Sequence, residues 1–286
     1  MIYLLLSIFF SAFTVSFFKI FEIKKVHTFQ AIIVNYLTCS IIGSFFAETK
    51  LWQAGLWQAD WLLYAAILGC LFIAIFYSIA LTAQKISVST SMVAAKLSVV
   101  VPVLMAFFLY HETLNGLKIF GILVSLIAVF FISRKSKSDP AELAHFWYLP
   151  LLVFMGSGAI DTLLNFVEEK FIPPFTADDI VTTAFFSAFV LGTTVLVIDS
   201  LKNRNPFFAK SVLWGILLGI PNYFSMYFLV KTLGAFPATF IFPINNIGIV
   251  AATTAIAVLA FKEKLNQKNT IGILLAIAAI VLIAFS

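Results

Sequence analysis

Long apolar stretches alternate with short polar connectors along the whole chain. A membrane-spanning helix needs roughly 20 apolar residues, and ten stretches meet that length, at residues 1–20, 28–47, 61–84, 88–110, 116–133, 146–169, 179–199, 211–233, 236–260 and 268–286. The connectors leave no room for a soluble domain. The pattern therefore predicts an all-α polytopic membrane protein with ten transmembrane helices.

Composition supports this prediction, because 62% hydrophobic and 11% charged residues, with a mean hydropathy of +1.06, lie outside the range of soluble domains. A net charge of +5 could suggest nucleic-acid binding in a soluble protein. Here the basic residues lie mostly between the apolar stretches, so no nucleic-acid partner is expected. Cys39 and Cys70 both fall inside predicted helices and are interpreted as buried thiols rather than a disulfide or a metal pair.

The basic residues are concentrated in alternate connectors. Connectors after the first, third, fifth, seventh and ninth predicted helices carry twelve Lys and Arg residues, whereas the others carry four. Cytoplasmic connectors are enriched in Lys and Arg. The chain is therefore predicted to be a multi-pass protein of the bacterial plasma membrane with both termini outside.

Several segments recur after 146 to 151 positions, which indicates an internal duplication. HETLNGLKIFGILVSLIAVFFIS, from residue 111, matches KEKLNQKNTIGILLAIAAIVLIAFS, from residue 262, and two further matches pair Gly43 with Gly192 and Gly69 with Gly219. We predict a first five-helix repeat at 1–133, a cytoplasmic linker at 134–145 and a second repeat at 146–286. An odd number of helices in each repeat inverts the second one in the membrane.

These two matched segments resemble the glutamate turn and the glycine-bearing fifth helix of the ten-helix EamA-type transporters of the drug/metabolite transporter superfamily. FYSIALTAQKISVSTSMVAAKLSVVVPVL also resembles their third helix leading into the fourth, although the second repeat reads AAT at 251–253 where the family has a proline. The resemblance covers essentially the whole chain. It implies a secondary transporter, interpreted as an exporter of small metabolites such as amino acids or related organic anions and zwitterions, working by alternating access around a central cavity.

Polar groups deep inside apolar helices are the candidates for substrate binding. An ionisable side chain at that depth costs roughly 2.5 to 3.5 kcal/mol on insertion scales and normally faces a cavity or a partner. Lys96 and Asp161 lie deepest, and Asn245 is the repeat counterpart of Lys96. The full set of predicted substrate-binding residues is Lys96, Asn245, Asn246, Asn222, Asn35, Asp161, Tyr77 and Tyr227.

Lys96 is predicted to hold a carboxylate or phosphate of the substrate. The alternatives are a packing pair with Asp161 and a lysine that exchanges a proton during transport. For the asparagines the alternative is hydrogen bonding between helices, and for the tyrosines it is ordinary aromatic packing.

Other classes of function fit the sequence less well. An intramembrane hydrolase would need a deep histidine or a pair of deep carboxylates, but His27, His111 and His145 all fall in connectors. We therefore predict no enzyme and no catalytic, metal or cofactor residue. A channel or a non-transporting scaffold is the remaining alternative. The expected partners are a small-molecule substrate, with a proton, and the lipid bilayer, and the duplication predicts a monomer.

Overall fold

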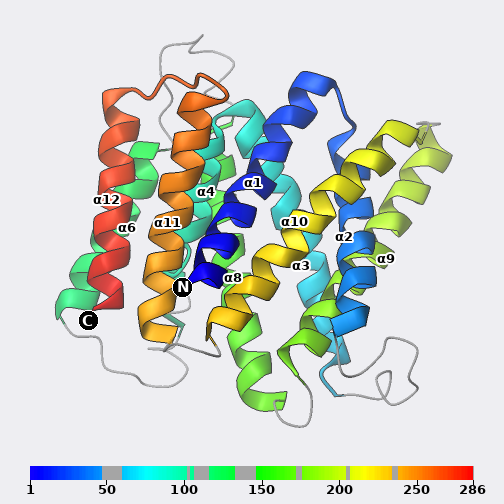
Figure 1. Cartoon of the computed structure of the whole chain (residues 1–286), viewed down its shortest axis with the longest axis horizontal. Coiled ribbons are helices and arrows are strands. Elements are labelled where there is room, and N and C mark those ends of the chain that lie inside the picture. Colours follow the sequence, from blue (N-terminus) through cyan, green and yellow to red (C-terminus); the bar gives the residue numbers. More distant parts are fainter. Residues whose placement is uncertain are drawn as a thin grey trace. The chain divides into compact units, whose positions relative to one another are not determined.

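The computed structural model describes residues 1–46, 60–101, 104–105, 116–132, 146–171, 176–203, 207–233 and 238–285. These residues form helices throughout and contain no strand (Figure 1). The all-α fold predicted from the hydrophobic pattern is confirmed. The helices are α1 (Ile2–Lys24), α2 (Thr28–Phe46), α3 (Leu62–Lys85), α4 (Val88–Leu97), α6 (Gly116–Ile132), α8 (Tyr148–Phe171), α9 (Ala177–Asn203), α10 (Ala209–Leu233), α11 (Ala238–Leu259) and α12 (Gln267–Ala284).

Helix α4 ends at Leu97, inside the predicted span at 88–110, and helical residues resume at Val100 after a turn at Ser98 and Val99. Pro102 has no backbone N–H, so it cannot make the helical hydrogen bond to the carbonyl of Ser98. The Ser98 carbonyl instead accepts from the amide of Val101 at 2.8 Å. The Ser98 hydroxyl donates to the carbonyl of Ala95 at 2.6 Å. A helical turn is thus interrupted directly after Leu97.

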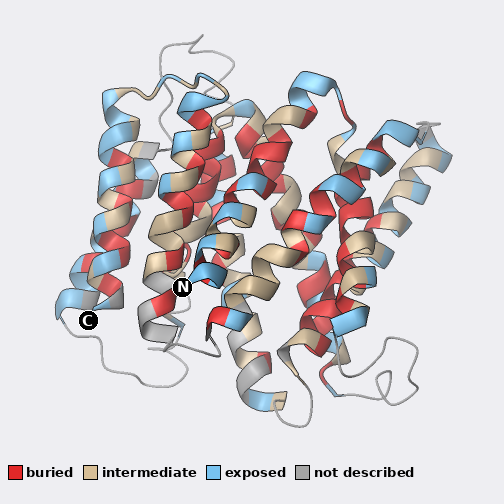
Figure 2. Cartoon of the chain, in the orientation of Figure 1, coloured by how far each residue is buried: buried red, intermediate tan, exposed pale blue. Residues whose placement is uncertain are grey.

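The surfaces of the helices suit a lipid solvent. Among the described residues, five helices are long and apolar enough to cross a membrane, and four further segments are shorter apolar helices. Large apolar side chains are exposed along α6 and α12, including Leu123, Phe130 and Leu274 (Figure 2). Such exposure is unfavourable in water and favourable against acyl chains. The chain is a polytopic membrane protein.

Contacts divide the chain into two compact units that do not follow the predicted repeats. The first unit comprises Met1–Glu22, Ser78–Ala159 and Phe224–Ser286, and the second comprises Ile23–Tyr77 and Ile160–Tyr223. Each unit therefore contains segments of both predicted repeats. The duplication was inferred from matching sequence segments, whereas the two units are defined by contacts between residues. The repeat boundaries at 133 and 146 therefore stay a prediction.

Within each unit, helices at equivalent positions of the two predicted repeats pack on each other. In the first unit α6 packs along α12 and α4 packs on α11, and in the second α2 packs on α9. Ser89 near the start of α4 hydrogen-bonds Thr254 near the end of α11 at 2.8 Å. Gly121 near the start of α6 lies against Ile283 at the end of α12. Both pairs are antiparallel, as inverted repeats require.

The contact between α2 and α9 is reciprocal. A Cβ on Gly43 of α2 would lie 2.5 Å from the Thr182 hydroxyl oxygen on α9, and one on Gly192 of α9 would lie 2.9 Å from Ile33 Cγ1 on α2. Ile33 and Thr182 are 149 positions apart, and so are Gly43 and Gly192. Contacts exchanged between equivalent residues in this way are the mark of a two-fold relation.

A second pair of contacts in the same unit follows the same rule. Gly69 of α3 meets Ser187 of α9, where a Cβ would lie 2.7 Å from the serine Cβ, and Gly219 of α10 meets Thr38 of α2 at 2.6 Å. Gly69 and Gly219 are 150 positions apart, and Thr38 and Ser187 are 149 positions apart. The contacts in the second unit are thus those expected of a pseudo-two-fold relation between the predicted repeats.

Candidate functional site

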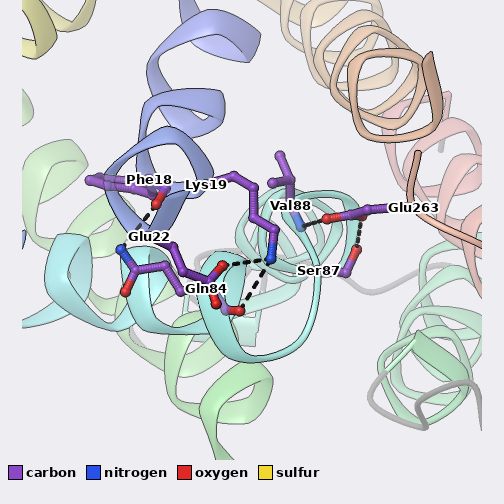
Figure 3. Close-up of polar contacts among 7 residues, drawn as sticks. All are labelled: Phe18, Lys19, Glu22, Gln84, Ser87, Val88 and Glu263. Carbon is purple, nitrogen blue, oxygen red and sulfur yellow. Dashed lines mark hydrogen bonds and ion pairs between the residues drawn. The ribbon is translucent and has the colours of Figure 1, made fainter. Parts of the chain in front are cut away.

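Polar side chains connect three helix ends at one end of the first unit (Figure 3). The Lys19 ammonium forms an ion pair with Glu22 at 2.6 Å and lies 3.5 Å from the carbonyl of Gln84 on α3. The Gln84 side-chain amide donates to the carbonyl of Phe18 at 3.0 Å. These contacts attach the end of α1 to the end of α3.

Glu263, in the connector before α12, binds the start of α4. Its carboxylate accepts from the Ser87 hydroxyl at 2.7 Å and from the Val88 amide at 3.1 Å. The Ser87 hydroxyl oxygen also accepts from the Thr90 amide at 3.2 Å, so Ser87 is the N-cap of α4. A negative charge at a helix N-terminus is favourable. Glu263 was matched in the sequence to Glu112, but its capping of a distant helix was not predicted.

Lys96 lies in the last turn of α4 and is half-buried. The carbonyls of a final helical turn carry partial negative charge, which stabilises a lysine at that position. The interruption after Leu97 therefore places Lys96 at the C-terminal end of a discontinuous helix. The close approach of Gly158 on α8 to Val101 and Ser98 fixes the backbone at this break.

Asn245, the predicted counterpart of Lys96, is buried on α11, and Asn246 beside it is half-buried. The hydroxyl of Ser7 on α1 lies 2.9 Å from the carbonyl of Ser225 and 3.4 Å from the amide oxygen of Asn245. Because a hydroxyl has one proton, Ser7 donates to the nearer acceptor, the Ser225 carbonyl. Asn245 thus lies where α1, α10 and α11 meet, and Ser7 is a polar neighbour that sequence analysis missed.

In the second unit the structure brings Asn35 and Asn222 together. The Asn222 side-chain amide donates to Asn35 Oδ1 at 3.1 Å. The Cys39 thiol approaches the same oxygen at 3.8 Å and the Gly219 carbonyl at 3.4 Å. Asn35 is fully buried, and its Nδ2 has no hydrogen-bond partner among the described residues. A buried amide donor left in this way is costly unless a ligand or water completes it.

The two thiols differ from each other. Cys39 is buried, as predicted, but Cys70 on α3 is exposed, so the prediction of a buried thiol is wrong there. A thiol behaves as a small hydrophobic group and suits a lipid-facing position.

The other candidates have varied surroundings. Asp161 on α8 is exposed. Tyr77 packs edge-on against Phe29 at 5.4 Å. The ring of Tyr227 lies 5.4 Å from the Lys231 ammonium. Tyr77 thus makes an ordinary aromatic contact, whereas Tyr227 makes a cation–π contact.

The candidates divide between the two units. Lys96, Asn245, Asn246 and Tyr227 belong to the first unit, where α4 packs on α11, and the remaining candidates belong to the second. The described residues contain no group of three His, Cys, Asp or Glu side chains that could hold a metal ion.

Comparison with known proteins gives a family for the first part of the chain. Residues 1–134 match the EamA-like transporter family. An uncharacterised protein from Haemophilus influenzae is 28% identical over 271 residues, covering 92% of this chain and 90% of that protein. A protein crystal structure shares the fold with a TM-score of 0.59 at 12% identity, covering 97% of this chain and 96% of the other. Residues 1–134 are thus identified as a domain of the EamA-like transporter family.

Proposed function

We propose that this protein is a secondary active transporter that exports small metabolites bearing a carboxylate or a phosphate, such as amino acids and related organic anions or zwitterions, by alternating access. The observation that carries the proposal is the position of Lys96 in the last turn of the interrupted helix α4. Substrate sites of many inverted-repeat transporters are built where membrane helices are discontinuous.

The chemistry of Lys96 suits an anionic cargo. Its ammonium offers three hydrogen-bond donors and no acceptor, and a lysine is a point charge that can meet a carboxylate or phosphate from several directions. Asn245 and Asn246 lie on α11, which packs on α4. Their amides can accept from an ammonium of a zwitterion and donate to its oxygens.

The amide cluster of the second unit offers a further polar contact. Asn35 Nδ2 is buried without a partner among the described residues, so a cargo carbonyl or a transported water would satisfy it. We include Asn222, Asp161, Tyr77 and Tyr227 among the residues that meet cargo during the cycle. A proton is the proposed coupling ion.

A counterflow experiment tests the proposal against a channel and a non-transporting scaffold. Purified protein is first screened by thermal shift against metabolites grouped by chemical class, and we expect carboxylated compounds to raise the melting temperature. Proteoliposomes loaded with an unlabelled hit should then transiently accumulate the labelled compound above equilibrium. A channel would only equilibrate the label. Accumulation equal to that of protein-free vesicles would contradict the transporter proposal. We propose that the monomer suffices, because one chain supplies both inverted repeats.

The proposed orientation has the basic connectors in the cytoplasm of a bacterial cell and both termini outside. Contacts inside each unit support a common end for these connectors. In the second unit the Lys210 ammonium binds the carbonyl of Lys24, and in the first unit Lys85 lies 5.9 Å from the ring of Phe146. The connectors after the first and seventh helices are therefore neighbours at Lys24 and Lys210, and Lys85 after the third helix lies beside Phe146 at the start of the sixth predicted helix.

Cysteine accessibility measures the orientation. In a background with Cys39→Ser and Cys70→Ser, we expect the variants Ser138→Cys and Asn203→Cys to resist an impermeant maleimide in intact cells and to react after lysis. Ser138 lies outside the described residues, so it is chosen from the sequence alone. Labelling of both variants in intact cells would reverse the orientation.

A further inference from the structure

The second unit contains a pocket of about 360 Å³ at the start of two helices. Its lining residues are Lys25, Val26, His27, Phe208, Lys210 and Ser211. The first three form the connector between α1 and α2, and the others form the first turn of α10 and the residue before it. None of the candidate substrate residues lines this pocket.

The N-termini of α2 and α10 converge on the pocket. Gly215 of α10 lies against Ala31 and Val34 of α2, and four residues later Gly219 lies against Asn35 and Thr38. The contacts advance in the same direction along both helices, so the helices are parallel, and both begin at the upper end of the view in Figure 1. Two helix N-termini therefore present their partial positive charge at one place.

The side chains at the pocket add to this positive charge. Lys25, His27 and Lys210 are exposed, and none of the six lining residues carries a carboxylate. The His27 Nδ1 accepts from the Gln30 amide at 3.4 Å, which assigns the proton of the neutral ring to Nε2. The His27 ring stacks on Phe208 with centroids 6.2 Å apart. The pocket thus combines cationic donors with an aromatic wall.

The Ser211 hydroxyl points to a missing hydrogen-bond partner in the pocket. Its side chain is fully buried and lines the pocket, and its hydroxyl has no hydrogen-bond partner among the described residues. The amide of Ser211 donates to the carbonyl of Phe208 at 2.8 Å, which holds the residue in the first turn of α10. A buried hydroxyl without a partner is unfavourable, and an oxygen of a bound anion would satisfy it.

We propose that this pocket binds a phosphate group, held by Lys25, Lys210, His27 and Ser211 at the paired N-termini of α2 and α10. The phosphate has two possible sources, the headgroup of an anionic phospholipid and a free phosphorylated solute. Exposed Phe207 and Phe208 beside the pocket fit the boundary between headgroups and acyl chains. Basic pockets between membrane helices on the cytoplasmic side commonly hold anionic headgroups.

Thermal stability of the full-length protein in nanodiscs tests the proposal. The melting temperature is measured in phosphatidylcholine alone, with added phosphatidylglycerol, and with inorganic phosphate at matched ionic strength. A rise with phosphatidylglycerol alone identifies a headgroup site, and a rise with phosphate in phosphatidylcholine identifies a solute site. Either result supports the proposed pocket if the rise in melting temperature is reduced in the two variants described next. No rise in either arm would overturn the proposal.

Two variants separate ligand binding from folding. Lys25 has φ 52°, a conformation that favours glycine, so Lys25→Gly should leave the ligand-free melting temperature unchanged or higher. Ser211→Ala removes an unsatisfied hydroxyl and should do the same. Each variant should nevertheless lower the apparent affinity for the stabilising phosphate compound, roughly fivefold for the lost lysine.

Lys202→Gln is the matched control, because it removes an exposed positive charge at the end of α9 without touching the pocket. Its affinity should stay within error of the wild type. Equal losses in Lys25→Gly and Lys202→Gln, with none in Ser211→Ala, would show general charge attraction to the membrane and would overturn a built site.

Discussion

Replacement of Lys96 by methionine is expected to abolish counterflow and to weaken binding of the best compound from the thermal-shift screen by at least about thirtyfold. This follows because loss of one partner from a desolvated charge contact costs roughly 2 to 5 kcal/mol of binding. Methionine preserves length and suits the half-buried position in α4. Expression and the ligand-free melting temperature should change little. Isothermal titration and proteoliposome counterflow measure the two effects.

The conservative and double variants distinguish binding from packing. Lys96→Arg should bind weakly with altered selectivity, because a planar guanidinium does not replace a compact ammonium. If Lys96 were instead half of a structural pair with Asp161, Lys96→Met would destabilise the fold by roughly 3 to 5 kcal/mol. Recovery of stability in Lys96→Met/Asp161→Asn, with ligand binding intact, would refute the cargo role.

Alanine at Gly69 or at Gly219 is expected to lower the melting temperature by several degrees, and by similar amounts at the two positions. An added Cβ would lie 2.7 Å from the Ala188 amide nitrogen in one case and 2.9 Å from the Asn35 carbonyl oxygen in the other. Backbone atoms cannot move aside as a flexible side chain can, and overpacking typically costs about 1 to 3 kcal/mol. This cost exceeds the gain of about 0.5 to 1 kcal/mol that alanine brings to a helix. Thermal unfolding in detergent measures the shift.

Gly116→Ala supplies the control for these variants. Gly116 begins α6, and among the described residues outside its own helix backbone no atom lies within 4 Å of the added Cβ, so the helical preference of alanine dominates there. Its melting temperature should equal or exceed that of the wild type. A loss at Gly69 without a matching loss at Gly219 would contradict the reciprocal packing of the two repeats.

Helix positions could be predicted from the sequence because bilayer thickness sets a minimum length for each apolar stretch. The end of α4 at Leu97 was missed, because apolar residues predominate as far as residue 110 and Pro102 was not interpreted as a helix break. The division into two units was also beyond the sequence. It depends on which helices pack together, and hydrophobic periodicity carries no such information for helices that are apolar on most sides.

The candidate site could be predicted only in part. Asn35 and Asn222 stood out as polar residues in apolar segments, and the structure joins them by a hydrogen bond. Ser7, which lies beside Asn245, and Cys39, which lies beside Asn35, were missed as polar neighbours. Small polar residues are common in membrane helices and cost little there. Glu263 binds a segment distant in the sequence, and Ser211 lines a pocket with another distant segment, so their surroundings become visible only once the chain is folded.

The double cap at the start of α4 determines how this end of the first unit can come apart. Ser87 is held by Glu263, but it also accepts the Thr90 amide by itself. If the connector before α12 withdraws, α4 keeps its serine cap, and the released carboxylate passes into water rather than into an apolar interior. Separation of the two connectors would therefore cost the two hydrogen bonds of Glu263 without removing the Ser87 cap of α4.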